Sequence, residues 1–391
     1  MLVSKPPLFA LCSILTALFL SACQSPANEP SASHAPLATM LTPAVQSLQQ
    51  AHEIPGMAIA VFKDGQSEGY YYGLASKETQ TPVTAETLFE IGSISKTFTA
   101  TLAAYAVRQQ KMAWTAPVSD YVPELAGDAF GQTSLLALAT HTTGGLPQQV
   151  PDEVQNAEDL LAYFKNWQPQ FAEGSNRTYS NLSIGLLGAI TADRWQQPFD
   201  AVLTQQLLQP LGLQQTFIKV PAQRMADYAQ GYNKRNEPVR VNPGVFEAEA
   251  YGVKTTALDL MRFVAANMHQ ITLAPMLQQA IDDTQIGYYQ AGTMTQGLIW
   301  ESYPYPTILN DVLAGNADHM GREAVAVTAV KPEASPQAVL LNKTGGTGGF
   351  SAYAAFVPSQ KVGVVILANK SFPIAPRVVL AQQILAHLTA Q

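Results

Sequence analysis

One lysine in an otherwise uncharged helical segment constrains the fold more than any other feature of the sequence. Residues 91–107, IGSISKTFTATLAAYAV, contain sixteen uncharged residues and Lys96. Apolar side chains recur there at the spacing of one helical face, at Ile94, Phe98, Leu102 and Tyr105. The remaining faces carry mostly Ala, Thr and Val. The segment therefore predicts a helix that is buried on all sides.

A buried ammonium loses hydration and persists only if it is paired, hydrogen-bonded or shifted towards its neutral form. Ser93 lies three residues before Lys96, so on a helix the two side chains are within reach of each other. Ser93 also follows Gly92 at the helix start, where free N–H groups and the helix dipole favour developing negative charge. Such a lysine can activate a serine as a nucleophile. A capping serine beside a lysine explains this motif alone equally well.

The composition excludes some classes of function. The chain has 391 residues, of which 47% are hydrophobic, enough for a large core. Its net charge of -7 and the lack of a basic run exclude a nucleic-acid partner. No two of the six histidines have the short spacing of zinc hydrolases, so we expect no metal site. His141, in HTTGGLP, is the one histidine left as a candidate for a Ser-His-Asp triad, and its interpretation as a hydrogen-bonded loop residue is favoured.

The N-terminal segment predicts export. Residues 1–23 contain one lysine, an apolar run and then small residues, as in a signal peptide, and the run is too short for a membrane span. The ending LSAC is similar to the lipobox of bacterial lipoproteins, which would acylate Cys23. Cleavage with release of the protein is the alternative and is slightly favoured. Residues 24–36, rich in Pro, Ser and Ala, predict a flexible spacer.

The rest of the chain predicts an α+β fold. An amphipathic helix begins near residue 37, and two apolar runs around a Lys-Asp-Gly turn predict a hairpin over residues 56–76. GQSEG, which matches the elbow motif of α/β-hydrolases, falls in that turn and is interpreted as turn sequence. Two more strands and a closing helix follow residue 350. We expect an antiparallel sheet with flanking helices from residues 37–107 and 320–391, and a mainly helical part over 108–319.

Two further motifs add to the Ser-x-x-Lys pair. Tyr179 and Asn181 stand just before an apolar helical run, in RTYSNLSIGLLGAI. Lys343 and Thr344 precede four glycines and a strand, where the backbone can approach a ligand closely and a Lys-Thr pair could bind a carboxylate. Each motif alone is common. Their order, with 86 residues from Ser93 to Tyr179 and 164 from there to Lys343, is much less expected by chance.

The set of Ser-x-x-Lys, Tyr-Ser-Asn and Lys-Thr-Gly resembles the penicillin-recognising serine enzymes. Together with LATHTTGGLPQQVPDE, VNPGVFEAEAYGVKTT and ILANKSFPIAPRV, it is similar to the class C serine β-lactamases, the cephalosporinase type. The similarity runs from about residue 37 to the C-terminus. It implies the serine β-lactamase/DD-peptidase-like fold, with the active site between the sheet part and the helical part.

The resemblance implies roles for particular residues. Ser93 would attack the lactam carbonyl, with Lys96 and Tyr179 sharing the general-base work and Lys343 completing the catalytic set. The backbone N–H groups of Ser93 and Gly346 would form the oxyanion hole. The substrate-binding residues would be Gln149 and Asn181 for the side-chain amide, Tyr251 for the pocket wall, and Thr344 and Arg377 with Lys343 for the carboxylate. No metal or organic cofactor is implied, and a monomer is expected.

Three positions depart from the class C pattern. Ile374 occupies a place where many relatives carry Asn, Gly346 replaces Ala or Ser, and His141 stands where Tyr is expected. The implied function is hydrolysis of β-lactam antibiotics, favouring cephalosporins and conferring resistance, in the periplasm. The alternatives are a D-alanyl-D-alanine carboxypeptidase or related esterase with slow lactam deacylation, and a non-catalytic lipoprotein that binds lactams. The intact set of three motifs argues against the last.

Overall fold

The computed structural model describes residues 35–332 and 338–390. The chain divides into two compact units, Met1–Pro36 and Leu37–Gln391, and the second one contains the fold. The predicted export signal with Cys23, and the spacer up to residue 34, lie outside the described residues. Among the described helices, none has both the length and the hydrophobicity needed to cross a membrane.

Helix α1 (Ala35–His52) begins within the last two residues of the predicted spacer. Residues 35 and 36 were assigned to the spacer but belong to the first turn of this helix, where a proline is tolerated because its missing N–H needs no partner. Leu37, Leu41 and Val45 are buried, as expected for one apolar face. The helix thus begins the folded unit.

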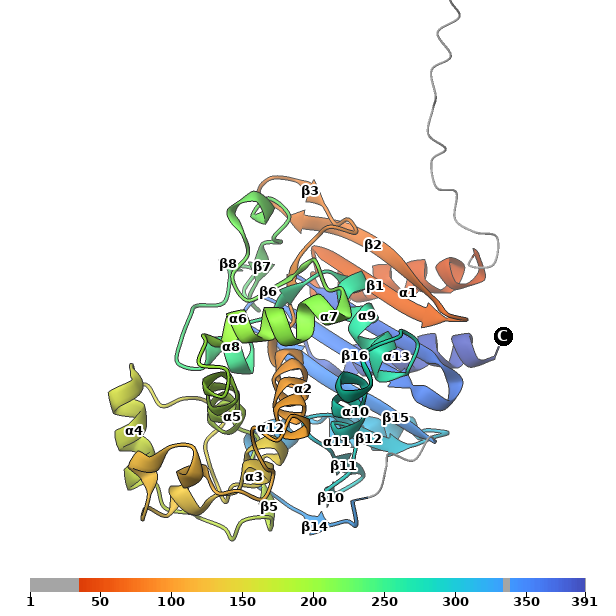
Figure 1. Cartoon of the computed structure of the whole chain (residues 1–391). Coiled ribbons are helices and arrows are strands. Elements are labelled where there is room, and N and C mark those ends of the chain that lie inside the picture. Colours follow the sequence, from red (N-terminus) through yellow and green to blue (C-terminus); the bar gives the residue numbers. More distant parts are fainter. Residues whose placement is uncertain (1–34, 333–337, 391) are drawn as a thin grey trace, which may run out of the picture. The chain divides into compact units, whose positions relative to one another are not determined.

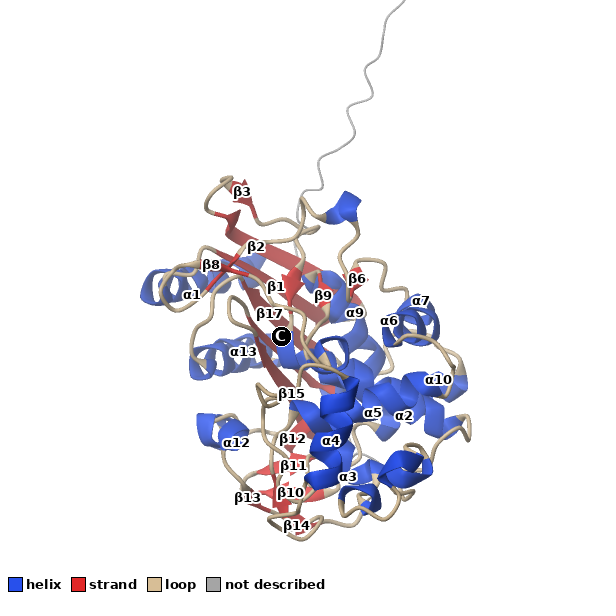
Figure 2. Cartoon of the chain, turned by 90° about the vertical axis from the view of Figure 1, so that its left-hand side faces the viewer, coloured by secondary structure: helices blue, strands red, loops and turns tan. Residues whose placement is uncertain are grey.

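A ten-stranded antiparallel sheet forms the centre of this unit (Figures 1 and 2). In spatial order its strands are β14 (Thr328–Ala329), β10 (Tyr289–Ala291), β11 (Met294–Gln296), β12 (Glu301–Pro304), β15 (Val339–Gly346), β16 (Ser351–Val357), β17 (Val362–Ala368), β1 (Gly56–Lys63), β2 (Gln66–Ser76) and β3 (Thr81–Pro82). Strands from both chain ends therefore pair at its middle, as predicted.

The first hairpin follows from its turn. Asp64 and Gly65 have φ values of 51° and 80°, the left-handed conformation that a two-residue hairpin turn requires. This turn sets Lys63 opposite Gln66 and continues the register through β1 and β2. GQSEG therefore lies in the turn and the following strand, with no helix after its serine.

Strand β1 is buried on both faces. Met57 and Ile59 of β1 point into a core shared with α1 and with α13 (Ile374–Thr389). Ala58 and Ala60 point to the opposite face, into a core shared with α9 (Ala257–Asn267). Figures 1 and 2 show α1 and α13 on one side of the sheet and α9 on the other. Burial on both faces explains the almost continuous apolar sequence of β1.

Helix α2 (Ser95–Arg108) separates two cores, which explains its uncharged sequence. Phe98 and Leu102 pack in the core that contains α9. Ala100 and Ala103 pack in a third core with α5 (Asn181–Asp193). The predicted helix, buried on all sides, is confirmed. Its single lysine therefore lies between packed layers.

Short helices joined by loops occur throughout the part between α2 and residue 319. They are α3 (Leu135–Thr140), α4 (Ala157–Asn166), α6 (Phe199–Leu203), α7 (Gln209–Leu211), α8 (Glu247–Ala250), α10 (Pro275–Asp283), α11 (Leu309–Gly315) and, just before residue 319, the start of α12 (Asp318–Arg322). Small strand pairings link them: β4 (Phe89–Glu90) and β6 (Thr216–Phe217) with β9 (Lys254–Thr255), β5 (Asn176–Arg177) with β13 (Val325–Ala326), and β7 (Gly231–Tyr232) with β8 (Pro238–Val239).

The main sheet also contains strands from the middle of the chain, in addition to those from its two ends. Strands β10, β11 and β12 lie within the stretch 108–319 that was predicted to be mainly helical, yet they join the sheet beside β15. Each has only three or four residues, too few to give a recognisable alternating pattern. Their pairing sets Glu301 opposite Asn342, next to Lys343.

Candidate active site

Ser93 lies in a tight turn at the start of α2. The turn Gly92–Ile94 is a single 3₁₀ turn that runs directly into the helix. Gly92 has a φ of 50°, and a Cβ there would lie 2.4 Å from the backbone nitrogen of Gly346. Only glycine allows both the conformation and this approach. The backbone just before Ser93 therefore packs directly against the end of β15.

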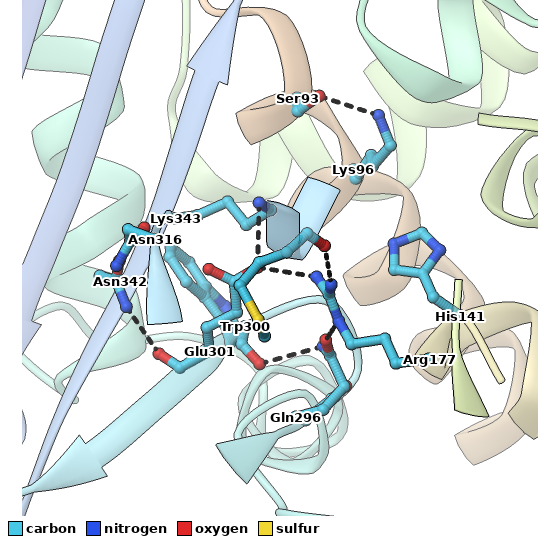
Figure 3. A network of polar contacts seen from close by, with 12 residues as sticks. Ser93, Lys96, His141, Arg177, Gln296, Trp300, Glu301, Asn316, Asn342 and Lys343 are labelled. Atoms are coloured by element: carbon cyan, nitrogen blue, oxygen red, sulfur yellow. Dashed lines mark hydrogen bonds and ion pairs between the residues drawn. The ribbon is translucent and has the colours of Figure 1, made fainter. Parts of the chain in front are cut away.

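Lys96 is fully buried behind Ser93 (Figure 3). Its Nζ lies 3.0 Å from Ser93 Oγ and 2.8 Å from the carbonyl oxygen of Ala250, the last residue of α8. Burial lowers the pKa of Lys96, and the nearby Lys343 cation lowers it further, while Tyr179 acts in the opposite direction. The geometry gives Ser93 a neighbouring amine that loses its proton more easily than an ordinary lysine.

Tyr179 stands among three cations. Ser180 caps α5 by accepting a hydrogen bond from the N–H of Ser183, and this fixes the residue before it at the helix entrance. The Tyr179 ring centre lies 5.1 Å from Nζ of Lys96, 5.1 Å from Nζ of Lys343 and 5.3 Å from the guanidinium of Arg177.

The same surroundings set the acidity of the Tyr179 phenol. Burial alone would raise its pKa, but the charges of Lys343 and Lys96 outweigh burial and lower it. No described neighbour makes a hydrogen bond of good geometry with its buried hydroxyl. Tyr179 and Lys96 are thus two buried titratable groups with lowered pKa values, coupled through their charges.

Lys343 belongs to a buried ionic network that the sequence analysis missed (Figure 3). Its Nζ lies 3.2 Å from Glu301 Oε1, which also accepts a bond of 3.2 Å from Arg177. Arg177 further donates to Gln296 Oε1 and to the carbonyl oxygen of Met320, both at 2.6 Å. The position of Arg177, two residues before Tyr179 on an extended segment, could have indicated from the sequence that it lies in the site. Nothing in the sequence around Glu301 indicated its place in the network.

A cavity of about 240 Å³ opens in front of Ser93. Of the predicted site residues, it is lined by Ser93, Tyr179, Lys343, Thr344, Gly346 and Arg377. Gln148, Arg177, Glu301 and Ile374 line it as well. Six predicted residues that lie up to 284 positions apart in the chain, from Ser93 to Arg377, therefore meet around one small space.

The remaining predicted substrate-binding residues lie beside this cavity and do not line it. Asn181 Nδ2 donates to Gln149 Oε1 at 2.8 Å, so these two side chains form one pair. Tyr251 follows Ala250 and is half-buried against the helical core. Lys96, the predicted catalytic lysine, does not line the cavity either, because it is buried behind Ser93.

Arg377 lines the cavity, and its guanidinium is bound to backbone carbonyl groups. Its guanidinium donates to the carbonyl oxygens of Gly345 at 2.8 Å and of Ala352 at 3.1 Å. Two further bonds reach the carbonyl oxygens of Phe372 and Pro373 at 2.6 and 3.2 Å. Because four bonds go to the backbone, this side chain holds the end of β15 against its neighbours and has little donor capacity left for a substrate.

His141 is hydrogen-bonded in a loop, as the sequence predicted, but it also packs on the site. Its Nδ1 lies 2.9 Å from Ser183 Oγ and 3.3 Å from the backbone nitrogen of Ser180. Its ring centre is 4.5 Å from that of Tyr179. Burial, reinforced by the charges of Arg177 and neighbouring lysines, lowers the pKa of His141 well below its ordinary value. A neutral imidazole therefore supports one face of the phenol.

Comparison with known proteins identifies this arrangement. The sequence model of the beta-lactamase family matches residues 41–389, which include every residue of the cavity. The chain belongs to the beta-lactamase family. A beta-lactamase from Pseudomonas fluorescens is 49% identical over 345 residues, covering 88% of this chain and 96% of that protein.

Solved structures place the chain among the class C members of the beta-lactamase family. A beta-lactamase/D-alanine carboxypeptidase from Pseudomonas syringae is 46% identical with a TM-score of 0.89, covering 90% of this chain and 99% of that one. A class C beta-lactamase in complex with cefoxitin is 45% identical with a TM-score of 0.88, covering 91% and 99% respectively. The resemblance to class C enzymes and the predicted fold class are confirmed.

Proposed function

We propose that this beta-lactamase hydrolyses β-lactam antibiotics, cephalosporins in particular, through an acyl-enzyme on Ser93, and so confers resistance. The observation that carries the proposal is the 3.0 Å separation of Lys96 Nζ and Ser93 Oγ at the base of the cavity. The class C relative solved with cefoxitin supports a lactam substrate. A binding protein would have no use for a lysine with a lowered pKa beside a serine.

In the acylation step, Ser93 Oγ attacks the lactam carbonyl while its proton passes to the base formed by Lys96 and Tyr179. The lactam C–N bond then breaks, and the same proton is delivered to the leaving nitrogen. In deacylation the pair takes a proton from water, the hydroxide attacks the ester, and Ser93 recovers its proton. The two residues share this work because their charges are coupled.

The oxyanion would lie between two backbone donors. The N–H groups of Ser93 and Gly346 come from the two segments that touch at Gly92. Each donor aimed at the developing charge contributes about 3 kcal/mol to transition-state stability. Because these donors belong to packed backbone, they need no rearrangement when the charge forms.

The substrate would be held at its two ends. Thr344 and the buried cation of Lys343 face the cavity and would bind the carboxylate. The Asn181 and Gln149 pair would bind the side-chain amide, with Tyr251 as the wall beside it. Arg377 would then act on the carboxylate mainly by fixing Gly345, since its own donors are occupied.

A substrate panel tests this proposal. The specificity constant kcat/KM is measured for a cephalosporin, a penicillin and a peptide ending in D-Ala-D-Ala, each with wild type and with Tyr179→Phe. We expect the largest value for the cephalosporin and a loss of about 100-fold or more in the variant. Turnover of the peptide, with only one equivalent of lactam consumed, would contradict the proposal.

That contrary result would support the second candidate function, D-alanyl-D-alanine carboxypeptidase activity. The Pseudomonas syringae relative carries both activities in its name, which keeps this candidate open. The same nucleophile and bases serve either substrate, and the two functions differ in how fast water attacks the acyl-enzyme. The peptide arm of the panel therefore separates them.

We also propose that the enzyme acts as a monomer in the periplasm, with release after signal cleavage favoured over a lipid anchor at Cys23. Support comes from the export-like sequence of residues 1–23. Cell fractionation with wild type and Cys23→Ala tests the location. Release of both forms with the periplasmic fraction agrees with the proposal, whereas retention of only the wild type with membranes indicates lipid attachment.

A further inference from the structure

The two segments that supply the oxyanion donors lie far apart in the chain and touch through glycines. A Cβ on Gly92 would lie 2.4 Å from Gly346 N, and a Cβ on Gly345 would lie 1.9 Å from the carbonyl oxygen of Ile91. Neither contact leaves room for a side chain. The two segments therefore approach each other backbone against backbone at Gly92 and Gly345.

The two segments differ in how firmly they are held. The segment before Ser93 is part of a small sheet, in which Glu90 pairs with Lys254 and the N–H of Ile91 bonds to the carbonyl oxygen of Val253 at 3.1 Å. The segment after Gly346 is a loop that contains Gly348 and Gly349 and leaves Gly346 exposed. Glycines give this loop high conformational freedom, so its position needs an additional restraint.

The carboxylate of Glu90 provides such a restraint. It is 1% exposed and lies three residues before Ser93. Its Oε2 accepts a hydrogen bond of 2.5 Å from the hydroxyl of Thr347, the residue directly after Gly346. Its Oε1 accepts bonds of 2.5 Å from the Tyr228 hydroxyl and 2.9 Å from the N–H of Val241. Hydrogen bonds to a carboxylate are short and strong, so this contact restrains the loop tightly.

We propose that Glu90 is a positioning residue of the oxyanion hole: through Thr347 it fixes the Gly346 N–H at the distance from Ser93 that the tetrahedral intermediate requires. It does not touch the substrate. The other two donors, Tyr228 and the N–H of Val241, orient the carboxylate towards the loop. The inference rests on the proposed acyl-transfer function, whichever acyl donor is the natural one.

The experiment changes this one contact in two ways: one variant removes the hydrogen bond and the other removes the charge of its acceptor. Thr347→Val keeps the shape of the side chain and deletes the donor, and Glu90→Gln keeps the size and deletes the charge. Thr347→Ser restores the hydroxyl, and Glu86→Gln is the control, because Glu86 is exposed and pairs with Arg224 on the surface. For each protein, kcat/KM, the melting temperature and the infrared stretching frequency of the acyl-enzyme ester carbonyl are measured with a slowly deacylated lactam.

We expect Thr347→Val and Glu90→Gln to lose about 10- to 100-fold in kcat/KM, less than complete removal of an oxyanion donor. The carbonyl band should move to higher frequency because the carbonyl is less polarised. The double variant should lose no more than the worse single variant, since both changes act through the same contact. Thr347→Ser and Glu86→Gln should behave as wild type.

An unchanged carbonyl band in Thr347→Val, or a rate loss fully explained by a lower melting temperature, would overturn the positioning role. Should Glu90→Gln fail to fold, Thr347→Val still decides the question. Failure of the proposed β-lactamase function gives a different signature, because it shows in the wild type: the acyl-enzyme accumulates without turnover while the band shift between variants remains. A wild type that forms no adduct at all overturns both.

Discussion

Nζ of Lys96 lies 3.0 Å from Oγ of Ser93. The same nitrogen lies 2.8 Å from the carbonyl oxygen of Ala250, and no part of the lysine is exposed to solvent. A lysine in an uncharged helix is therefore explained by its contacts: its desolvated amine is held against a hydroxyl and a carbonyl oxygen. Burial and the Lys343 cation lower the pKa of Lys96, and the charges of Lys343 and Lys96 lower the pKa of Tyr179.

Lys96→Arg tests the need for a neutral amine. The guanidinium keeps the charge but remains protonated at any working pH, so it cannot accept the Ser93 proton. We expect the acylation rate, measured by rapid mixing, to fall by about 100-fold or more. Lys111→Arg, at an exposed position just beyond the same helix, is the control and should retain full activity. An acylation rate in Lys96→Arg within a few-fold of wild type would refute the general-base role.

Lys343→Met should move the acid limb of the kcat/KM profile to higher pH. The Lys343 cation lowers the pKa of Tyr179 and also that of Lys96, so both pKa values rise when it is removed. Both basic forms then appear only at higher pH. Glu301, which keeps Arg177 as its charged partner, also raises the pKa of Tyr179. Loss of the Lys343 cation also weakens substrate binding, which lowers kcat/KM at every pH without moving the acid limb. An acid limb that stays in place or moves to lower pH contradicts this account.

Adjacent glycines should respond differently to alanine. At Gly345 a Cβ would lie 1.9 Å from the carbonyl oxygen of Ile91, whereas at Gly346 the nearest atom is the carbonyl oxygen of Phe350 at 3.5 Å. We expect Gly345→Ala to lose about 1–3 kcal/mol in denaturant unfolding, together with most of its activity. Gly346→Ala should keep both. Equal behaviour of the two variants would show that the contact between the two segments is less tight than described.

Arg177→Met should destabilise the protein strongly. It leaves Glu301 with only Lys343 as a charged partner and removes the donors to Gln296 and Met320. Breaking such a buried pair costs about 3–5 kcal/mol. Arg108→Met breaks an ion pair with Asp283 on the surface and should cost no more than about 1 kcal/mol. Equilibrium unfolding measures both, and a similar loss in the two variants would contradict the importance assigned to the buried network.

The sequence predicted what local patterns determine. The buried helix, the hairpin at Asp64 and Gly65, and the closing pair of strands follow from periodicity and turn chemistry. The pairing of Ser93 with Lys96 followed from their spacing of three residues, although Ser93 lies in a 3₁₀ turn and not in the α-helix itself. The resemblance to a known family supplied the rest of the site.

Other features depend on tertiary structure and have no local signal. Glu301 meets Arg177 and Lys343 across 124 and 42 residues, in a strand too short to show a pattern. The partners of Arg377 are backbone carbonyl groups, whose positions no side-chain pattern reports. Glu90 is one of many acidic residues until the fold brings Thr347 to it.

The most direct test of the central claim is intact-protein mass spectrometry during turnover of a chromogenic cephalosporin, with wild type beside Ser93→Ala. The account predicts sustained turnover by the wild type, a transient mass increase of one opened lactam, and neither signal in Ser93→Ala. Turnover that persists in Ser93→Ala would exclude this serine as the nucleophile. A stable adduct on the wild type after a single turnover would show that Lys96 and Tyr179 do not activate water, and would contradict the β-lactamase function.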